Sequence, residues 1–142
     1  MIEDMIQDLS RYQESELDEK IQAALGKYPF AKAIYALDRN GLQATRFVCD
    51  PELKLRKGIF RLPSRGTDYS TRDFYYGLVD SGFNRDNYTS EAYISPATGL
   101  FCLTISAKIK DKLGTEFILC VDVEPTYLKH MGKLVDLIGD LD

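Results

Sequence analysis

The stretch that decides the fold is residues 92–123, which read AYISPATGLFCLTISAKIKDKLGTEFILCVDV. It contains three extended runs, at residues 92–94, 101–109 and 116–123. Pro96 and Gly99 lie in the first connection, and Asp111 and Gly114 lie in the second. These residue types favour turns, and strands joined by short turns pair with each other. We therefore expect an antiparallel meander of three strands.

Two further strands are expected closer to the N-terminus. Residues 33–37 and 42–48 are extended runs that flank the sequence Asp38-Arg39-Asn40-Gly41. Asn and Gly both tolerate positive φ, so this pair is typical of a tight hairpin turn. The pattern predicts a second antiparallel hairpin. Residues 49–69 show no sustained period and are expected to form a long excursion from the sheet.

Helices are expected at three places. In residues 1–26 the apolar side chains are three or four positions apart and end at Gly26, which predicts one long helix. Ser70 can cap a second helix with Asp73 as its capping partner, and that helix should end near Gly82. Pro125 suits the first turn of a closing helix over residues 125–141.

This order of elements predicts an α+β fold. A long N-terminal helix precedes five antiparallel strands, one helix is inserted after strand two, and a C-terminal helix closes the chain, which is a PAS-like arrangement. With 142 residues the chain has room for one domain over residues 1–142. Its core should span residues 30–124, between the helix at 1–26 and the helix at 125–141.

Composition argues against several classes of function. A net charge of −4 argues against nucleic acid as a partner, because phosphate binding needs a basic face. Apolar runs are too short for a membrane span, and the N-terminus lacks a signal-peptide pattern, so we expect a soluble cytoplasmic protein. Neither the three cysteines nor the single His130 has metal-ligand spacing, and no cofactor or catalytic motif is present. We do not expect an enzyme.

The residues that could carry function are one anion, one cation and several aromatics. Asp122 should share a strand face with Ile118 and Cys120, and a carboxylate on an apolar face needs a partner. The planar guanidinium of Arg72 can hold a carboxylate through two parallel hydrogen bonds, while Asp122 takes an ammonium group. The remaining candidates, which would form walls and donate hydrogen bonds, are Phe74, Tyr75 and Tyr93.

Each candidate also has a purely structural interpretation. Arg72 can be a surface charge in the first turn of a helix, and Asp122 can simply end its strand. Phe74 and Tyr75 stand at helical spacing with later apolar residues, which is common for core residues.

The ordered series of motifs resembles the Cache family of bacterial sensor domains, also called PDC domains. It consists of Ser70-x-Arg72-x-Phe74-Tyr75, residues 90–99 (SEAYISPATG), Thr104-Ile105-Ser106 and Val121-Asp122-Val123, and residues 35–41 look like the family's first strand and turn. The resemblance covers roughly residues 30–124. It implies a PAS-like sheet with a ligand pocket on one face.

The resemblance also implies roles for single residues. In amino-acid-binding members, the positions of Arg72, Phe74 and Tyr75 hold the carboxylate, that of Tyr93 assists, and that of Asp122 holds the amine. Three positions depart from the family pattern. Phe74 stands where many members have tryptophan, Ser95 stands where an acid is frequent, and Thr67 stands where an aromatic is usual, with Tyr69 close by.

Two functions are therefore expected. The first is a sensor domain that binds a small ligand, an amino acid or a small carboxylate, and passes the signal to a partner or output domain. The second is a ligand-free interaction module that forms a homodimer through the apolar stripes of its terminal helices. In that case Leu9 and Ile21 would lie at the dimer interface.

Overall fold

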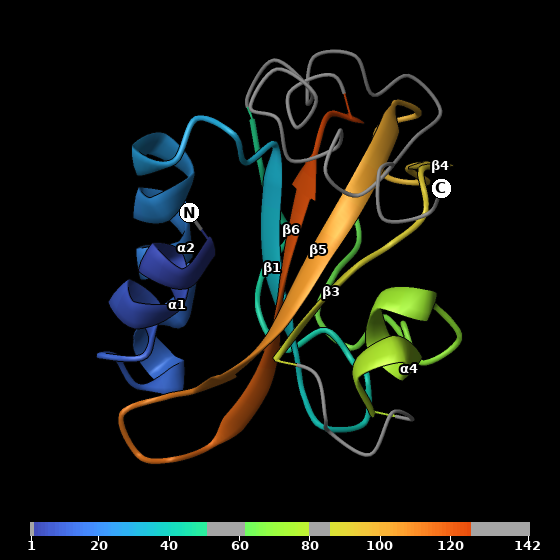
Figure 1. Cartoon of the computed structure of the whole chain (residues 1–142). Coiled ribbons are helices and arrows are strands. Elements are labelled where there is room, and N and C mark those ends of the chain that lie inside the picture. The colour runs from blue at the N-terminus through green and yellow to red at the C-terminus, as the bar shows by residue number, and fades with distance from the viewer. Residues whose placement is uncertain (1, 51–61, 80–85, 126–142) are drawn as a thin grey trace.

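The computed structural model describes residues 2–50, 62–79 and 86–125. Two helices come first, followed by two strands, one helix and four strands (Figure 1). The elements are α1 (Ile2–Leu9), α2 (Glu14–Lys27), β1 (Ala33–Leu37), β2 (Val48–Cys49), α4 (Asp73–Val79), β3 (Asn87–Thr89), β4 (Tyr93–Ile94), β5 (Phe101–Lys110) and β6 (Glu116–Val123).

The strands form one antiparallel sheet in the order β2-β1-β6-β5-β3, and β4 also pairs with β5. The long β5–β6 hairpin is the centre of this sheet, and β1 lies beside β6. The expected α+β class is confirmed, with an antiparallel sheet and a helix between the second and third strands. The closing helix expected over residues 125–141 and the expected helix end near Gly82 lie outside the described residues.

The sheet is covered on both faces. Figure 1 shows α1 and α2 on one face and α4 on the other. Side chains alternate along β1, so that Ile34 and Ala36 pack under α1 and α2, whereas Tyr35 and Leu37 pack on the α4 side. The burial of all five β1 residues follows from this position between two layers.

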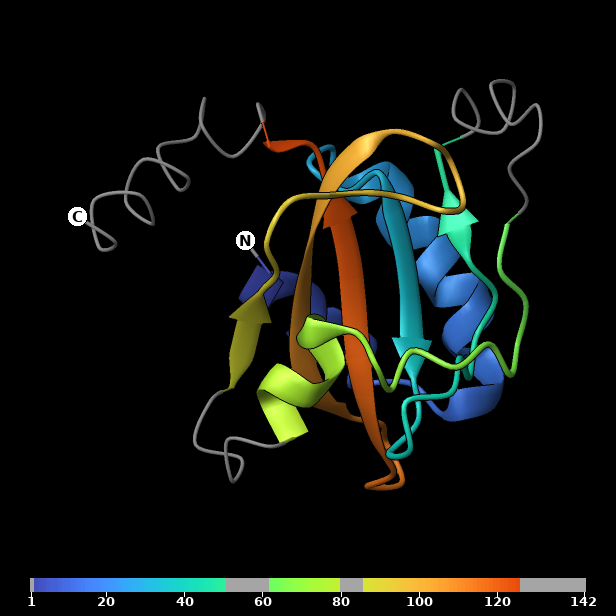
Figure 2. The same cartoon turned by 90° about the vertical axis from the view of Figure 1, so that its right-hand side faces the viewer.

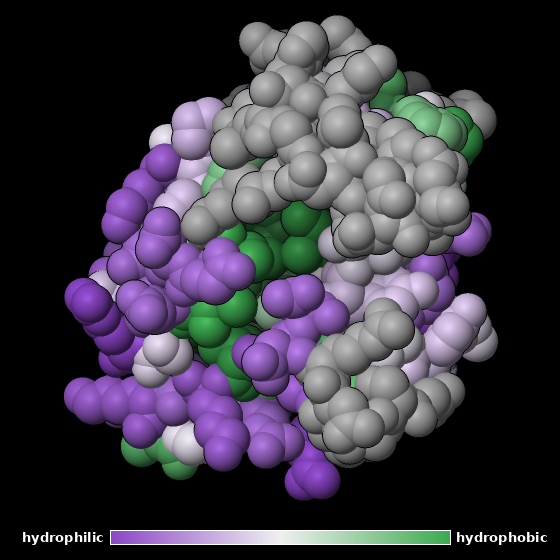
Figure 3. Space-filling view, in the orientation of Figure 1, coloured by the Kyte–Doolittle hydropathy of each residue, from purple (hydrophilic) through white to green (hydrophobic). Residues whose placement is uncertain are grey.

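The N-terminal helices turn their apolar residues inward. Leu9 and Ile21 are both buried in the core beneath the sheet. Hydrophilic residues cover the outer side of α1 and α2 in Figure 3, and apolar residues gather between these helices and the sheet. The expectation that Leu9 and Ile21 lie at a dimer interface is therefore wrong for these two side chains. Dimerisation itself stays a prediction.

The expected single helix over residues 1–26 is also wrong, because the chain breaks between α1 and α2. Gln13 has extended backbone angles, and its N–H donates to the side chain of Glu16 at 3.3 Å, which caps the start of α2. The N–H of Glu14 donates to the carboxylate of Asp111, 3.2 Å away in the β5–β6 turn. A contact between two residues that are 97 positions apart in the sequence thus fixes where α2 begins.

The Asn-Gly turn forms as expected, but the strand after it is shorter than predicted. Gly41 has φ of +86°, and the N–H of Asp38 donates to the carbonyl of Leu42. Beyond the turn, the hydroxyl of Thr45 accepts the N–H of Ala36 at 3.0 Å. A side chain thus replaces the backbone carbonyl of a regular ladder, and β2 is limited to Val48–Cys49.

The helix inserted after β2 begins at Asp73, and Ser70 does not have the capping role expected of it. The N–H of Ser70 donates to the side chain of Asp68 at 2.8 Å. The carboxylate of Asp73 accepts bonds from the N–H of Glu91 (3.3 Å) and the hydroxyl of Tyr88 (3.4 Å). Asp73 therefore joins the start of α4 to β3 and to the segment that leads into β4.

Strand β3 is the element that the sequence analysis missed. It pairs with residues 105–107 of β5, whereas β4, the expected strand at 92–94, pairs with residues 101–102. Along residues 2–50, 62–79 and 86–125, no helix has the length and apolar character needed to cross a membrane.

Candidate functional site

Asp122 is a buried carboxylate on the α4 side of the sheet. It shares its face with Ile118 and Cys120, as the alternation predicts, and is 5% exposed. Thr104, its direct partner on β5, donates a hydrogen bond of 2.7 Å to Asp122 Oδ1. The hydroxyl of Tyr35 donates to the same oxygen at 3.4 Å. The backbone of β6 thus places the carboxyl group of Asp122 in the space between the sheet and α4.

A second hydroxyl extends this network. Tyr93 Oη lies 2.5 Å from Thr104 Oγ1. Because Thr104 donates its own proton to Asp122, its oxygen is left to accept from Tyr93. A chain of hydrogen bonds therefore runs from β4 through β5 to the carboxylate on β6.

The burial of Asp122 changes its acidity. Loss of hydration raises the pKa of Asp122 to about 7, and the bonds from Thr104 and Tyr35 and the charge of Arg72 only partly oppose this rise. Near neutral pH the carboxyl is therefore poised between its neutral and charged forms. An additional cation in the site would favour the charged form.

Arg72 faces the same space from the start of α4. Its guanidinium carbon lies 4.4 Å from the ring centroid of Tyr93 and 5.7 Å from that of Phe74. Contacts of this kind hold a guanidinium by cation–π attraction without occupying all of its N–H donors. Arg72 is thus placed near Asp122 with donor groups available for an anion.

Aromatic rings surround these two charged residues. Tyr35 stacks on Phe47 and Tyr69 with centroid separations of 4.9 and 5.3 Å, and Phe74 stacks on Tyr93 at 6.4 Å. The space that they enclose has a volume of about 20 Å³. Its lining residues are Tyr35, Phe47, Pro63, Tyr69, Arg72, Phe74, Tyr93, Ser95, Pro96, Ala97 and Asp122.

Four of the five expected site residues meet at this cavity, namely Arg72, Phe74, Tyr93 and Asp122. Tyr75 is not among the lining residues. Its hydroxyl donates to the carbonyl of Arg39 at 2.7 Å, beside the turn between β1 and β2. The structure thus places the Tyr75 hydroxyl at this turn, outside the lining of the cavity, and a ligand-binding role for it stays a prediction.

Sequence analysis missed several residues of the cavity. Tyr35 and Thr104 reach Asp122 only because of the register that pairs β1 and β5 with β6. Side-chain alternation along residues 33–37, together with this register, places Tyr35 on the same face of the sheet as Asp122. Tyr69, noted as a neighbour of Thr67, supplies a wall. Ser95 lines the cavity too, and its hydroxyl accepts the backbone N–H of Ala97 in a turn.

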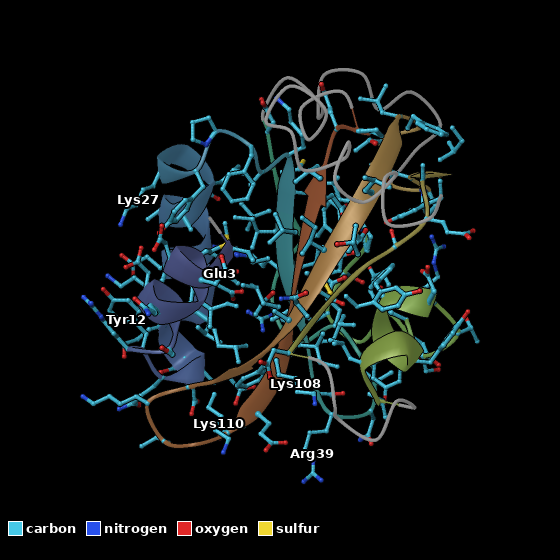
Figure 4. The ribbon with its side chains drawn as sticks, in the orientation of Figure 1. Glu3, Tyr12, Lys27, Arg39, Lys108 and Lys110 are labelled. Atoms are coloured by element: carbon cyan, nitrogen blue, oxygen red, sulfur yellow. The ribbon has the colours of Figure 1, made fainter. Side chains whose placement is uncertain are left out.

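A larger hollow of about 520 Å³ lies at the far end of the sheet. Figure 4 shows Arg39, Lys108 and Lys110 gathered at this end of the molecule, and all three line the hollow. Its other lining residues include Val79, the last described residue of α4. None of the described residues that line the hollow is a buried polar side chain comparable to Asp122, so the smaller cavity remains the candidate site.

No family model and no curated protein matches this chain. Among solved structures, the Bacillus subtilis YkuI protein, which has an EAL domain, matches with a TM-score of 0.67 and 20% identity. The match covers 94% of this chain and 32% of that one.

Two chemoreceptor domains give similar results. The ligand-binding domain of Campylobacter jejuni Tlp3, solved with L-norvaline, matches with a TM-score of 0.65 and 16% identity over 91% of this chain and 50% of its own. That of Pseudomonas fluorescens CtaA, solved with L-isoleucine, matches with a TM-score of 0.58 and 22% identity over 89% and 47%. The chain has the fold of a bacterial sensor domain. It spans a third to a half of the length of these structures.

Proposed function

We propose that this sensor-fold chain is a Cache-type domain that binds a small amino acid or carboxylate between Arg72 and Asp122. The observation that carries the proposal is the pair of opposite charges at one aromatic cavity, where one member is a buried carboxylate. A guanidinium is suited to a carboxylate, and a buried carboxylate is suited to an ammonium group.

The other lining groups favour a ligand whose side chain is uncharged and small. Among the described residues, Arg72 and Asp122 are the charged members of the lining, so a zwitterion leaves the site neutral. The remaining walls are mostly rings, prolines and an alanine. Apolar walls with few placed polar groups are typical of small-ligand sites. The ligands named for the Tlp3 and CtaA structures, L-norvaline and L-isoleucine, have this character.

The cavity must widen before it can hold such a molecule. A volume of about 20 Å³ has room for roughly one water molecule. Arg72 lies on the ring of Tyr93, so binding would draw the guanidinium toward the ligand carboxylate. In this proposal the cavity is narrow in the described conformation, and ligand binding widens it.

A thermal-shift screen of the amino acids and a matched set of simple carboxylates tests the proposal. A true ligand must raise Tm by mass action, because it binds the folded state alone. We expect the shift to disappear in Arg72→Ala. Asp122→Asn should abolish it for an amino acid and spare it for a carboxylate without an amine. If no compound shifts the wild type, or if every shift survives Arg72→Ala, the proposal is wrong.

The second candidate is a ligand-free interaction module that binds only a partner protein or a second copy of this chain. The small volume of the cavity is the observation that favours it. In this case the screen gives no shift, and native mass spectrometry shows a dimer or a complex with an output protein. Signal transfer to such an output, cytoplasmic location and the lack of enzymatic activity remain part of the proposal.

A further inference from the structure

One wall of the cavity is a segment that crosses the sheet without belonging to it. Residues 62–72, called the crossing segment below, run in front of β1 and β6 to reach α4 (Figure 2). Pro63, Tyr69 and Arg72 of this segment line the cavity. Any widening of the cavity toward this side requires the crossing segment to move.

Backbone hydrogen bonds attach the crossing segment to the β1–β2 connection. The N–H of Gly66 donates to the carbonyl of Gln43, and the N–H of Gln43 donates to the carbonyl of Thr67, both at 2.8 Å. The N–H of Tyr69 donates to the carbonyl of Gly41, also at 2.8 Å. These three bonds form a short ladder at the edge of the molecule.

A single carboxylate on α2 attaches this ladder to the opposite layer. Asp18 forms an ion pair with Arg65 of the crossing segment and accepts the backbone N–H of Arg46 at 2.8 Å. The guanidinium of Arg65 also donates to the carbonyl of Ala44 at 2.5 Å. The Asp18 side chain is 21% exposed and that of Arg65 is 55% exposed, so solvent is partly excluded on the Asp18 side of the contact. Asp18 thus connects α2 to both strands of the ladder.

The same region separates the small cavity from a larger groove. Phe47 and Pro63 line the cavity, and they also line a groove of about 490 Å³ beside α2. The other described residues that line this groove are Gln22, Arg46, Val48, Leu62, Ser64 and Arg65. A displacement of Pro63 away from Phe47 would join the two spaces.

We propose that Asp18 holds the crossing segment closed over the cavity, and that ligand entry breaks the Asp18–Arg65 contact and opens the cavity toward the groove beside α2. The ligand part of this inference rests on the proposed function. Because binding free energies are reciprocal, a contact that opposes opening also opposes ligand binding. A ligand bound in the cavity would then change the contacts of Asp18 in α2, which lies on the other face of the sheet.

The first test needs no ligand. Amide hydrogen exchange of Gly66, Gln43 and Tyr69 is compared in the wild type, Asp18→Ala and Arg65→Met. A hydrogen bond to a charged group changes an equilibrium constant by roughly a factor of ten, so these amides should exchange about tenfold faster relative to amides of the β5–β6 ladder. The double variant should accelerate exchange by less than the product of the two single effects, because both substitutions remove the Asp18–Arg65 contact, although each also removes a hydrogen bond of its own.

Asp8→Ala is the matched control. Asp8 also forms an ion pair across the helical layer, with Lys27, and contacts Tyr28, yet it does not contact the crossing segment. The exchange rates of the three amides should be unchanged in this variant. Equal rates in the wild type and in Asp18→Ala, or the same acceleration in Asp8→Ala, would overturn the inference.

The second test measures affinity for L-isoleucine and L-norvaline as probes. If the Asp18–Arg65 contact opposes opening, Asp18→Ala and Arg65→Met should lower Kd by up to about tenfold. A role limited to folding would raise Kd or leave it unchanged, and either result contradicts the proposal. If neither probe binds the wild type, the proposed function loses its support, and hydrogen exchange alone decides whether Asp18 holds the segment closed.

Discussion

Thr104 and Asp122 lie directly opposite each other on β5 and β6, and the Thr104 hydroxyl donates a 2.7 Å hydrogen bond to Asp122 Oδ1. This cross-strand pair fixes the orientation of a carboxylate that burial alone would make unstable. It also links Tyr93 of β4 to the same carboxylate. The pair therefore connects the stability of the sheet to the chemistry of the cavity.

The first prediction concerns pH and Asp122. Its pKa is about 7 in the folded protein against an ordinary value of 3.8. The folded protein therefore retains a proton that the unfolded chain releases between these two values. The contribution of Asp122 to the free energy of unfolding is fully present below about pH 4 and is lost as pH rises through 7. The free energy of unfolding should therefore fall by up to about 4 kcal/mol over this range.

Asp122→Asn isolates this effect, because asparagine does not titrate. We expect the variant to be more stable than the wild type above pH 7, with the difference shrinking toward pH 4. Urea unfolding at several pH values measures the difference in free energy of unfolding. A difference that does not vary with pH would show that Asp122 is not buried as described.

The second prediction concerns the hydroxyl of Thr104. Thr104→Val removes a bond that lowers the pKa of Asp122, so this pKa should rise further. The loss of a buried donor should also cost about 1–3 kcal/mol of stability. Carboxyl ¹³C chemical shifts of Asp122 followed against pH measure the first effect. Thr104→Ser is the control, because it keeps the hydroxyl and should restore the titration of the wild type.

The third prediction concerns the close packing of α4 on β3. A Cβ on Gly77 would lie 2.5 Å from the ring of Tyr88. Gly77→Ala should therefore destabilise the protein by about 1–3 kcal/mol, although alanine favours a helix. Thermal unfolding provides the measurement.

Gly26→Ala is the matched control for this substitution. Gly26 lies in α2, and its added Cβ would meet no atom within 4 Å. This variant should be stabilised by about 0.5–1 kcal/mol. If the two variants change Tm in the same direction, α4 does not pack on Tyr88 as described.

The fourth prediction concerns Asp111, which fixes the start of α2. Its carboxylate accepts the N–H groups of Glu14, Leu113 and Thr115. Asp111→Ala should cost about 2–3 kcal/mol, because three donors lose a charged acceptor. Circular dichroism during urea unfolding should show a lower midpoint.

Asp38→Ala serves as a comparison for Asp111→Ala. Asp38 also accepts two local N–H groups in a turn, from Asn40 and Leu42, but the hydrogen bonds stay within one connection. Its loss should cost less, about 1 kcal/mol. An equal or larger loss would mean that the contact between Asp111 and α2 contributes nothing.

Much of the fold follows from local patterns in the sequence. The apolar runs at 33–37 and 116–123 predict strands, and Asn40-Gly41 predicts the turn between β1 and β2. These features depend on neighbours in the chain. Side-chain alternation along the strand also predicts that Asp122 shares a face with Ile118 and Cys120, and the structure places these two residues on the α4 side of the sheet.

The remaining features depend on contacts between distant residues. The break after α1 is fixed by Asp111, and the shortening of β2 is fixed by the hydroxyl of Thr45. Tyr35 and Thr104 reach Asp122 only through strand register. Tyr75 points to the β1–β2 turn because of where α4 packs, which the spacing of the motif does not determine.

The electron density between Arg72 and Asp122 is the most direct test of the proposed ligand site. It should be measured in crystals soaked with the compound that raises Tm most in the thermal-shift screen. We predict a ligand carboxylate on the guanidinium of Arg72, now moved away from Tyr93, with the ligand amine at hydrogen-bond distance from Asp122. An empty cavity with Arg72 still on Tyr93, or density only in the hollow beside Arg39 and Lys110, would contradict the account.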